Sequence, residues 1–214
     1  MTLTVLAYGD SNTHGTAPMA TATEKVRFDP EIRWTGHARG LLPADTILIE
    51  EGHPGRTTVH DDPIEGAHRN GLAILPAILE SHRPLDAVIL MLGTNDMKAR
   101  FSVTAEDVAA SLDRLIRTIR AAEAGPDLGE PKVLLVCPPP VAETGCLEGM
   151  FRGGAAKSAA LTPLAARVAE AQGAGFLDAG AHIAVSPVDG VHFDAEAHAV
   201  LGRAIGAAVA EMMG

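Results

Sequence analysis

The sequence predicts an α/β fold, a three-layer α/β/α sandwich built on a five-stranded, mainly parallel sheet. Five short apolar runs alternate with segments of helical periodicity, which is typical of parallel strands joined by helical crossovers. Aromatic residues make up only 3% of the chain and hydrophobic residues 47%, so small aliphatic side chains must fill the core. The 214 residues suit one domain spanning 1–214, without repeats, low-complexity tracts or an interdomain linker.

The predicted strands are the five apolar runs. They cover residues 3–8, 46–50, 87–92, 133–137 and 175–178. The third run is the most apolar, so we expect it to lie at the centre of the sheet.

The clearest predicted helix covers residues 105–122. Thr104 and Asp107 have the spacing of a capping box at its start, and Gly125-Pro126 follows its end. Its apolar residues share one face: Val108, Leu112, Leu115, Ile116 and Ile119.

Three more segments favour helix. One covers 158–172, and another follows Asp194, a suitable N-cap, with Ala197 among the residues facing inward. The segment 70–82 carries an apolar stripe in which Pro76 should kink the helix or mark its start. Two long stretches, 16–30 and 138–157, remain irregular, and loops of this length in a compact domain are usually functional or interfacial.

Charge and cysteine content exclude several classes of function. The net charge of −10 argues against nucleic acid or an anionic membrane as partner, because both require clustered Lys and Arg. Only Cys137 and Cys146 are present, which indicates free thiols in a reducing compartment. We see no signal peptide and no apolar stretch near the ~18 residues of a membrane helix, so the expected location is the cytoplasm.

Ser11 is the candidate nucleophile. It follows the first predicted strand within Gly9-Asp10-Ser11, where a sharp turn would hold its hydroxyl out of the sheet. Helix N–H groups starting there would favour negative charge beside it. The same tripeptide also forms ordinary turns and helix caps, so it does not identify a nucleophile by itself.

His192 is the candidate base, and Asp189 is the candidate that orients it. The two are three residues apart in Asp189-Gly190-Val191-His192, so one tight turn can bring the carboxylate to a ring nitrogen. The other ring nitrogen would then face Ser11. An Asp-Gly turn followed by a surface histidine is the alternative, since the chain has nine histidines.

Gly55, Asn95 and the Ser11 backbone are the candidate oxyanion donors. Asn95 follows the third strand and Gly55 follows the second, and the carboxyl ends of parallel strands are where α/β sheets bind ligands. An amide side chain and two backbone N–H groups can stabilise a carbonyl oxyanion there. Turn chemistry explains each segment equally well when it is taken alone.

Other candidate sites are weaker. Cys137 ends a strand and is expected to be a buried apolar residue. His60, Asp61 and Asp62 lack metal-ligand spacing and are expected to form a solvated acidic loop. No cofactor or metal motif is present, so we predict neither.

Serine after strand one, glycine after strand two, asparagine after strand three and Asp-x-x-His before the last helix form one ordered set. The sequence therefore resembles the SGNH, or GDSL-type, hydrolase superfamily over nearly its full length. The matching blocks are 9–15, Gly55, 93–96 and 189–193. The resemblance implies a flavodoxin-like SGNH hydrolase fold, a Ser11–His192–Asp189 triad and an oxyanion hole of Ser11, Gly55 and Asn95.

Within that superfamily the chain is most similar to the bacterial arylesterase and acyltransferase (perhydrolase) branch. The segments that carry this similarity are 26–28, 32–36, 50–52, 56–58, 91–96 and 138–140. The similarity implies activity on short-chain and aryl esters, some acyl transfer, and homo-oligomers whose loops narrow the pocket. Asn12, His14 and Thr16 put polar groups beside Ser11, which favours water as acceptor and hence hydrolysis.

The sequence thus predicts a serine esterase acting on a small-molecule ester through an acyl-enzyme. One alternative is a deacetylase of an acetylated sugar or other small metabolite, which would use the same triad in a different pocket. Another is a non-catalytic binding module, which requires that Ser11, Asn95, Asp189 or His192 be missing or out of geometry.

Overall fold

The computed structural model describes residues 2–214 and contains one five-stranded sheet. All its strand pairs are parallel, in the order β2-β1-β3-β4-β5. The strands are β1 (Thr4–Gly9), β2 (Ile47–Gly52), β3 (Ala87–Met91), β4 (Lys132–Cys137) and β5 (Gly175–Asp178). The predicted α/β/α sandwich is confirmed, with strand bounds within two residues of those predicted and β3 buried throughout at the centre.

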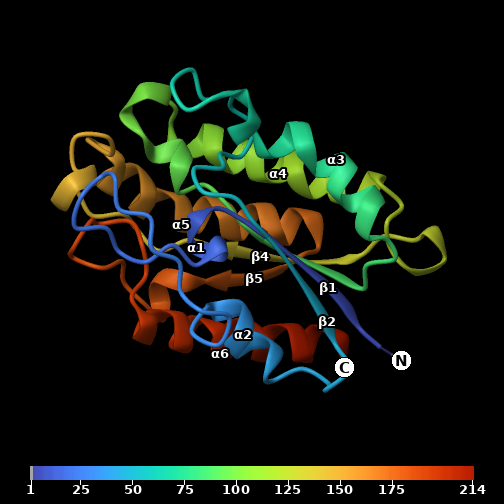
Figure 1. Ribbon diagram of the computed structural model, residues 1–214. Coiled ribbons are helices and arrows are strands. Elements are labelled where there is room, and N and C mark those ends of the chain that lie inside the picture. Colours follow the sequence, from blue (N-terminus) through green and yellow to red (C-terminus); the bar gives the residue numbers. More distant parts are fainter. Residues whose placement is uncertain (1) are drawn as a thin grey trace.

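The described residues form six α-helices, which lie between or after the strands and cover the sheet (Figure 1). They are α1 (Ser11–His14), α2 (Trp34–Arg39), α3 (Gly71–His82), α4 (Ala105–Ala121), α5 (Gly154–Gln172) and α6 (Ala195–Met213). Short 3₁₀ helices cover Ala67–Arg69, Asn95–Met97, Ala99–Phe101, Pro126–Leu128, Gly145–Leu147 and Ala179–Ala181. None of the helices within residues 2–214 is both long and apolar enough to cross a bilayer.

The alternation of side chains along the strands divides the core into two layers. On β1, Leu6 and Tyr8 point to the layer formed with α3, α4 and α5. Val5 and Ala7 point to the opposite layer, formed with α2 and α6. Because successive strand residues face opposite sides, a strand buried on both faces must be apolar at nearly every position.

The helix starts are predicted best where a capping side chain directly precedes the helix. The Thr104 hydroxyl accepts the Asp107 N–H at 3.1 Å and the Asp107 carboxylate accepts the Thr104 N–H, so α4 begins at its capping box. Asn70 caps α3, which therefore begins before Pro76 and includes it. The helix predicted to begin at Ser158 begins at Gly154 instead, and the Ser158 hydroxyl donates back to the Gly154 carbonyl.

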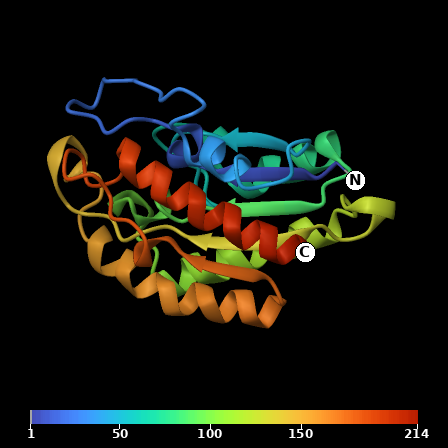
Figure 2. The same cartoon turned by 90° about the horizontal axis from the view of Figure 1, so that it is seen from below.

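The two irregular stretches lie at the same end of the sheet, the end opposite the two termini (Figures 1 and 2). Residues 16–30 fold back on themselves through a bridge between Thr16 and Arg27. The stretch 138–157 contains the short helix Gly145–Leu147 and the first turn of α5. The carboxyl ends of the strands thus lie beneath two long segments.

Candidate active site

Ser11 is the first residue of α1, directly after β1. The Asp10 carboxylate caps this helix by accepting the Asn12 N–H at 2.9 Å. Helix α1 packs closely on β2, because a Cβ at Gly52 would lie only 2.1 Å from the His14 nitrogen. The sharp strand-to-helix turn that the sequence predicts is therefore present, with Ser11 at the carboxyl end of the sheet.

Three candidate side chains form a continuous hydrogen-bonded chain. His192 Nε2 lies 3.1 Å from Ser11 Oγ, and His192 Nδ1 lies 2.7 Å from Asp189 Oδ2. With the ring proton on Nδ1 and donated to the carboxylate, Nε2 can accept the proton of the Ser11 hydroxyl. All three residues are at most 5% exposed, so little water competes for these hydrogen bonds.

The Asp189–His192 turn is fixed by backbone donors. Asp189 Oδ1 accepts the N–H groups of Val191 and His192 at 3.0 and 2.9 Å. Burial raises the pKa of Asp189, but the hydrogen bonds and charge of His192 and the N–H of Met19 outweigh it and lower that pKa to about 2. The carboxylate therefore stays ionised at neutral pH.

Asn12 joins this turn to α1. Its Nδ2 donates to the Val191 carbonyl at 3.2 Å, and its Oδ1 accepts the Phe193 N–H at 3.2 Å. The two bonds bracket His192 and hold it over Ser11. From the sequence, Asn12 is expected only as a polar group beside Ser11. Nothing in the sequence indicates that its amide bonds to residues 191 and 193.

The three candidate oxyanion donors lie on separate segments around Ser11. Asn95 opens the 3₁₀ helix after β3, and its Nδ2 donates to the Arg56 carbonyl at 3.1 Å and to Asp10 Oδ2 at 3.3 Å. The second of these bonds is long for an N–H···O contact and is the easier one to exchange. Within residues 2–214, neither the Ser11 N–H nor the Gly55 N–H has a hydrogen-bond acceptor.

The segment carrying Gly55 is anchored by buried polar groups. Asp96, fully buried, accepts the Thr58 N–H, the Thr58 hydroxyl and His60 Nδ1. The hydrogen bond to Asp96 raises the pKa of His60. These contacts tie the chain that follows Arg56 to Asp96, the residue next to Asn95.

A second anchor corrects the prediction for the acidic loop. Asp62 is only 2% exposed and binds Arg100 at 3.0 Å, with Lys98 3.7 Å away. Lys98 also binds Glu65 at 2.9 Å. The prediction of a solvated loop is therefore wrong for Asp62, which cations from the segment after β3 bury, whereas Asp61 is exposed as expected. Sequence spacing could not reveal this pairing.

A buried arginine, Arg56, contacts the end of β1 just before Ser11. Arg56 lies 4.2 Å from the centroid of the Tyr8 ring and donates to the Gly9 carbonyl at 2.8 Å. It also offsets the charge of Asp10, whose pKa burial raises to about 6. Arg56 was expected only as part of a family segment, and its structural role was not foreseen.

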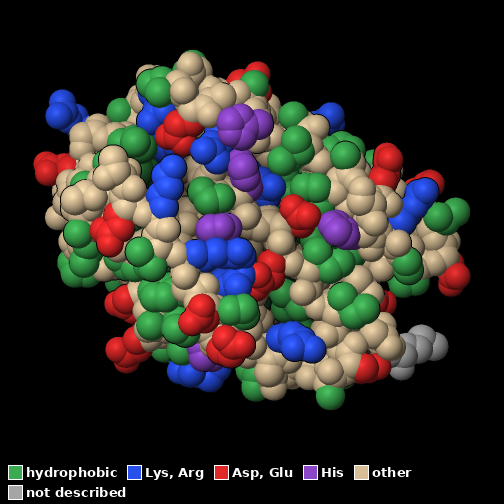
Figure 3. Space-filling view, in the orientation of Figure 1, with side chains coloured by type: hydrophobic (Ala, Val, Ile, Leu, Met, Phe, Trp, Pro, Cys, Tyr) green, Lys and Arg blue, Asp and Glu red, His purple; other side chains and the backbone are tan. Residues whose placement is uncertain are grey.

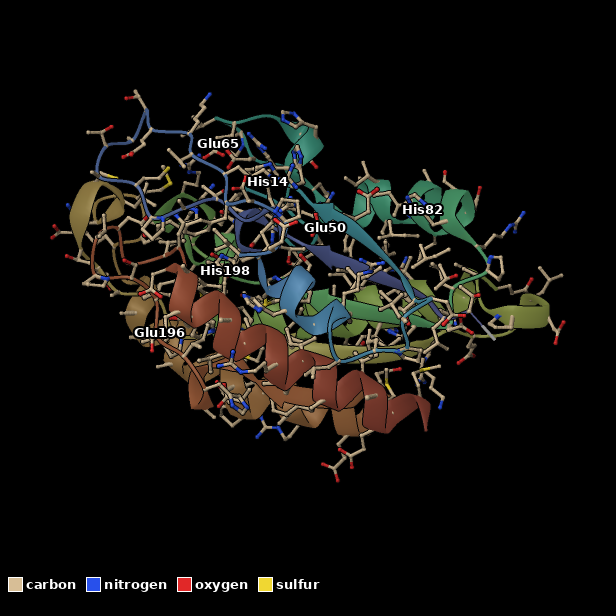
Figure 4. All side chains as sticks on the ribbon, turned by 60° about the horizontal axis from the view of Figure 1, so that its bottom comes forward. His14, Glu50, Glu65, His82, Glu196 and His198 are labelled. Atoms are coloured by element: carbon tan, nitrogen blue, oxygen red, sulfur yellow. The ribbon has the colours of Figure 1, made fainter. Side chains whose placement is uncertain are left out.

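Ser11, Gly55, Asn95 and His192 line a cavity of about 450 Å³. Part of its wall is apolar, formed by Met19, Leu147, Met150, Phe151 and Val191. Another part is polar, formed by His14, Thr16, Glu65, Arg69 and Lys98. Figure 3 shows Lys, Arg and His side chains gathered around the position of α1, and Figure 4 shows His14 and Glu65 at this end of the sheet.

His14 and Thr16 line the cavity as expected, whereas Asn12 is buried beneath it. A second hollow, of about 520 Å³ over α2 and β2, contains none of the candidate residues. Among residues 2–214, no three His, Cys, Asp or Glu side chains gather as they would around a metal ion.

Comparison with known proteins identifies the family. Residues 7–200 match the GDSL-like Lipase/Acylhydrolase family. No curated protein matches this chain at a significant level.

Several solved structures share the fold and much of the sequence. The carbohydrate acetylesterase Est24 from Sinorhizobium meliloti is 40% identical, with a TM-score of 0.93 over 98% of this chain and 99% of its own. The aryl esterase from M. smegmatis is 38% identical, with a TM-score of 0.93 over the same shares. A carbohydrate acetylesterase family member from Sinorhizobium meliloti is 39% identical, with a TM-score of 0.90 over 99% of both chains. The chain therefore belongs to the GDSL-like lipase/acylhydrolase family, within the SGNH superfamily, and is a carboxylic ester hydrolase.

Proposed function

We propose that Ser11 is the nucleophile of this esterase, with His192 as general base and Asp189 as the group that orients the imidazole. The observation that carries the proposal is the hydrogen-bonded chain from Ser11 Oγ through His192 to Asp189. Its geometry is that of a serine triad, in which a buried carboxylate fixes the tautomer and stabilises the imidazolium that forms. The binding-module alternative required one of these residues to be absent or displaced.

In the first half-reaction, Ser11 Oγ attacks the ester carbonyl while His192 Nε2 takes its proton. Negative charge then develops on the carbonyl oxygen, and the proposed donors to it are the Ser11 N–H, the Gly55 N–H and the Asn95 amide. Within the described part of the chain, 2–214, the two backbone donors have no competing acceptor. The long Asn95–Asp10 bond can be exchanged for one to the oxyanion. His192 next protonates the departing alcohol or phenol, which leaves an acyl-Ser11 ester.

In the second half-reaction, His192 removes a proton from water and the resulting hydroxide attacks the acyl-Ser11 carbonyl. Ser11 Oγ departs and regains its proton from His192, which releases the acid. Another alcohol or hydrogen peroxide could replace water in principle, which would be acyl transfer. The polar groups of His14 and Thr16 in the cavity wall favour water as acceptor.

Short-chain acyl and aryl esters are the substrates we propose. A cavity of about 450 Å³ with an apolar wall suits an aromatic ring or a short acyl chain. The likeness to an aryl esterase supports this substrate class.

The alternative is deacetylation of a sugar or another acetylated metabolite. The polar part of the wall, which includes Glu65, Arg69 and Lys98, offers hydrogen bonds to hydroxyl groups. The likeness to carbohydrate acetylesterases supports this candidate. Comparing kcat/KM for phenyl acetate and for an acetylated sugar separates the two, because only the deacetylase should prefer the sugar.

The proposed nucleophile has a direct test. A fluorophosphonate reagent should label the wild-type protein at one serine and should fail to label Ser11→Ala, which should also lose ester turnover. Circular dichroism of both proteins controls for folding. Labelling of Ser11→Ala at another residue would assign the nucleophile elsewhere.

We also propose that the chain acts as one cytoplasmic domain in a homo-oligomer, without cofactor, membrane or nucleic acid. The net charge of −10 disfavours polyanions, and the long segments at the site offer contacts between copies. A particle of the monomer mass, 22.2 kDa, in light scattering would contradict the oligomer. A rate series with p-nitrophenyl esters of increasing length, with and without a competing alcohol, would define the acyl pocket and the acceptor.

A further inference from the structure

The long segment 16–30 makes a direct contact with the triad carboxylate. The Met19 N–H donates to Asp189 Oδ2 at 2.8 Å, and the same oxygen accepts from His192 Nδ1 at 2.7 Å. Asp189 Oδ1 is occupied separately by backbone donors of its own turn, from Val191 and His192. Met19 is therefore the donor to Asp189 that comes from outside the turn 189–192.

Both the N–H and the carbonyl of Met19 are hydrogen-bonded. The Cys146 thiol donates to the Met19 carbonyl at 3.3 Å, which ties residue 19 to the short helix Gly145–Leu147. The base of the segment is tied to the end of α1, because the Phe28 N–H donates to the Gly15 carbonyl and Arg27 Nε donates to the His14 carbonyl, both at 2.8 Å. The segment thus joins the Ser11 helix to the Asp189 turn.

The same segment forms one wall of the substrate cavity. Its lining residues include Thr16, Met19, Glu24, Lys25, Val26 and Arg27. In Figure 2 this segment runs as a blue loop across the carboxyl end of the sheet. The segment 16–30 therefore both lines the substrate cavity and donates a hydrogen bond to Asp189.

We propose that the Met19 N–H is a positioning group for Asp189, so that seating of segment 16–30 over the cavity is coupled to the alignment of His192 with Ser11. This inference rests on the proposed function. The physical reason is that Asp189 Oδ2 receives two donors from different directions, which together fix the plane of the carboxylate. Without the Met19 donor, Oδ2 keeps only His192, and the carboxylate can twist about its anchored Oδ1, which tilts the imidazole relative to Ser11.

The sharpest test removes this hydrogen-bond donor and keeps every side chain. Replacing the residue-19 peptide bond by an ester, through the α-hydroxy analogue of methionine, deletes the N–H and keeps the side chain. The matched control is the same replacement at residue 23, an exposed position of the same segment where, within residues 2–214, neither the N–H nor the preceding carbonyl is hydrogen-bonded. We expect the residue-19 ester to lower kcat for p-nitrophenyl acetate by about tenfold or more with KM nearly unchanged, because a hydrogen bond to a charged group is lost. The residue-23 ester should keep kcat within about twofold, as surface changes usually do.

A spectroscopic readout separates positioning from a general structural effect. The proton shared by His192 Nδ1 and Asp189 should give a low-field resonance, since it lies in a short, buried, charge-assisted bond. This resonance should shift in the residue-19 ester and stay in place in the residue-23 ester. An unchanged kcat together with an unchanged resonance in the residue-19 ester would overturn the proposal.

Cys146 provides a second route to the same contact. Burial raises the pKa of the Cys137 thiol to about 12, whereas Cys146 is exposed, so iodoacetamide should modify Cys146 alone. Modification removes the donor to the Met19 carbonyl and should lower kcat in the wild-type protein. Cys146→Ser keeps a donor and lacks the thiol, so its turnover should resist the reagent. Equal resistance of both proteins would count against the coupling.

Ser11→Ala, measured in parallel, distinguishes failure of the Met19 inference from failure of the proposed function. If Ser11→Ala is inactive while the residue-19 ester is fully active, the triad stands and only the Met19 inference fails. If Ser11→Ala retains turnover, the proposed function itself fails.

Discussion

The Asn12 side chain donates to the Val191 carbonyl at 3.2 Å, which ties the helix of the candidate nucleophile to the turn of the candidate base. Its Oδ1 completes the link by accepting the Phe193 N–H. The two chain segments are 179 positions apart in sequence for the first bond and 181 for the second. One buried amide therefore links the two segments that carry Ser11 and His192.

Asn12→Ala should lower both kcat and stability. The substitution leaves a buried carbonyl and a buried N–H without partners, at a cost of about 1–3 kcal/mol each, and frees the turn that holds His192. Gln172→Ala is the control, since it deletes an amide that donates to Asp113 between α4 and α5, far from the cavity. Urea unfolding and p-nitrophenyl acetate kinetics should show both proteins destabilised and only Asn12→Ala impaired in kcat. Equal kcat in the two variants would deny Asn12 this positioning role.

Asn95→Ala should lower kcat by roughly 10²–10³-fold, the usual cost of losing one oxyanion donor. KM should change little, because the donor acts mainly on the charge that develops in the transition state. Steady-state kinetics with an activated short-chain ester measures both constants. An unchanged kcat would remove Asn95 from the oxyanion hole.

Gly55→Ala should impair turnover and stability through backbone geometry alone. Gly55 has a φ of +77°, where an alanine is strained by about 1–2 kcal/mol, and the added Cβ would lie 2.8 Å from Glu65 Oε2. The Glu65 carboxylate ends a flexible side chain and can move aside, whereas relief of the backbone strain displaces the Gly55 N–H, a proposed oxyanion donor. Gly149→Ala is the control, because a Cβ there would meet nothing within 4 Å. Kinetics and thermal unfolding of the two variants should differ clearly, and similar behaviour would contradict a precise role for the Gly55 backbone.

His198 should make the protein less stable in acid. It is fully buried at the start of α6 (Figure 4), where its Nδ1 accepts the Trp34 N–H at 3.2 Å. Burial lowers its pKa from 6.5 to about 4, so between these values the unfolded chain binds the extra proton and folding stability falls as the pH falls. The full shift corresponds to about 3 kcal/mol.

The variant His198→Asn keeps an acceptor for the Trp34 N–H and does not titrate. Urea unfolding at pH 7.5 and pH 4.5 should show a loss of stability in the wild-type protein larger by roughly 2–3 kcal/mol than in His198→Asn. Other acid-sensitive groups are common to both proteins and cancel in the comparison. Equal losses would mean that His198 is not the group responsible.

Much of the fold could be predicted because its signals are local. The apolar runs identified all five strands, and Thr104 with Asp107 gave the start of α4. Helix α2 was missed, since it has only six residues and no capping side chain. The predicted start of α5 is four residues late, because Gly153 caps the helix without a side-chain hydrogen bond and leaves no capping signal in the sequence.

The sequence by itself determined the parallel α/β fold and the candidates Ser11, Gly55, Asn95, Asp189 and His192, because their positions after strands and before the last helix are a property of chain order. Only the tertiary structure decided how these residues are held: by the Asn12 amide, the Met19 N–H, and the carboxylates of Asp62 and Asp96. Those contacts join segments far apart in the chain, and a buried polar group is assigned its partner by whichever donor folding brings within about 3 Å. No local pattern of residues encodes that choice.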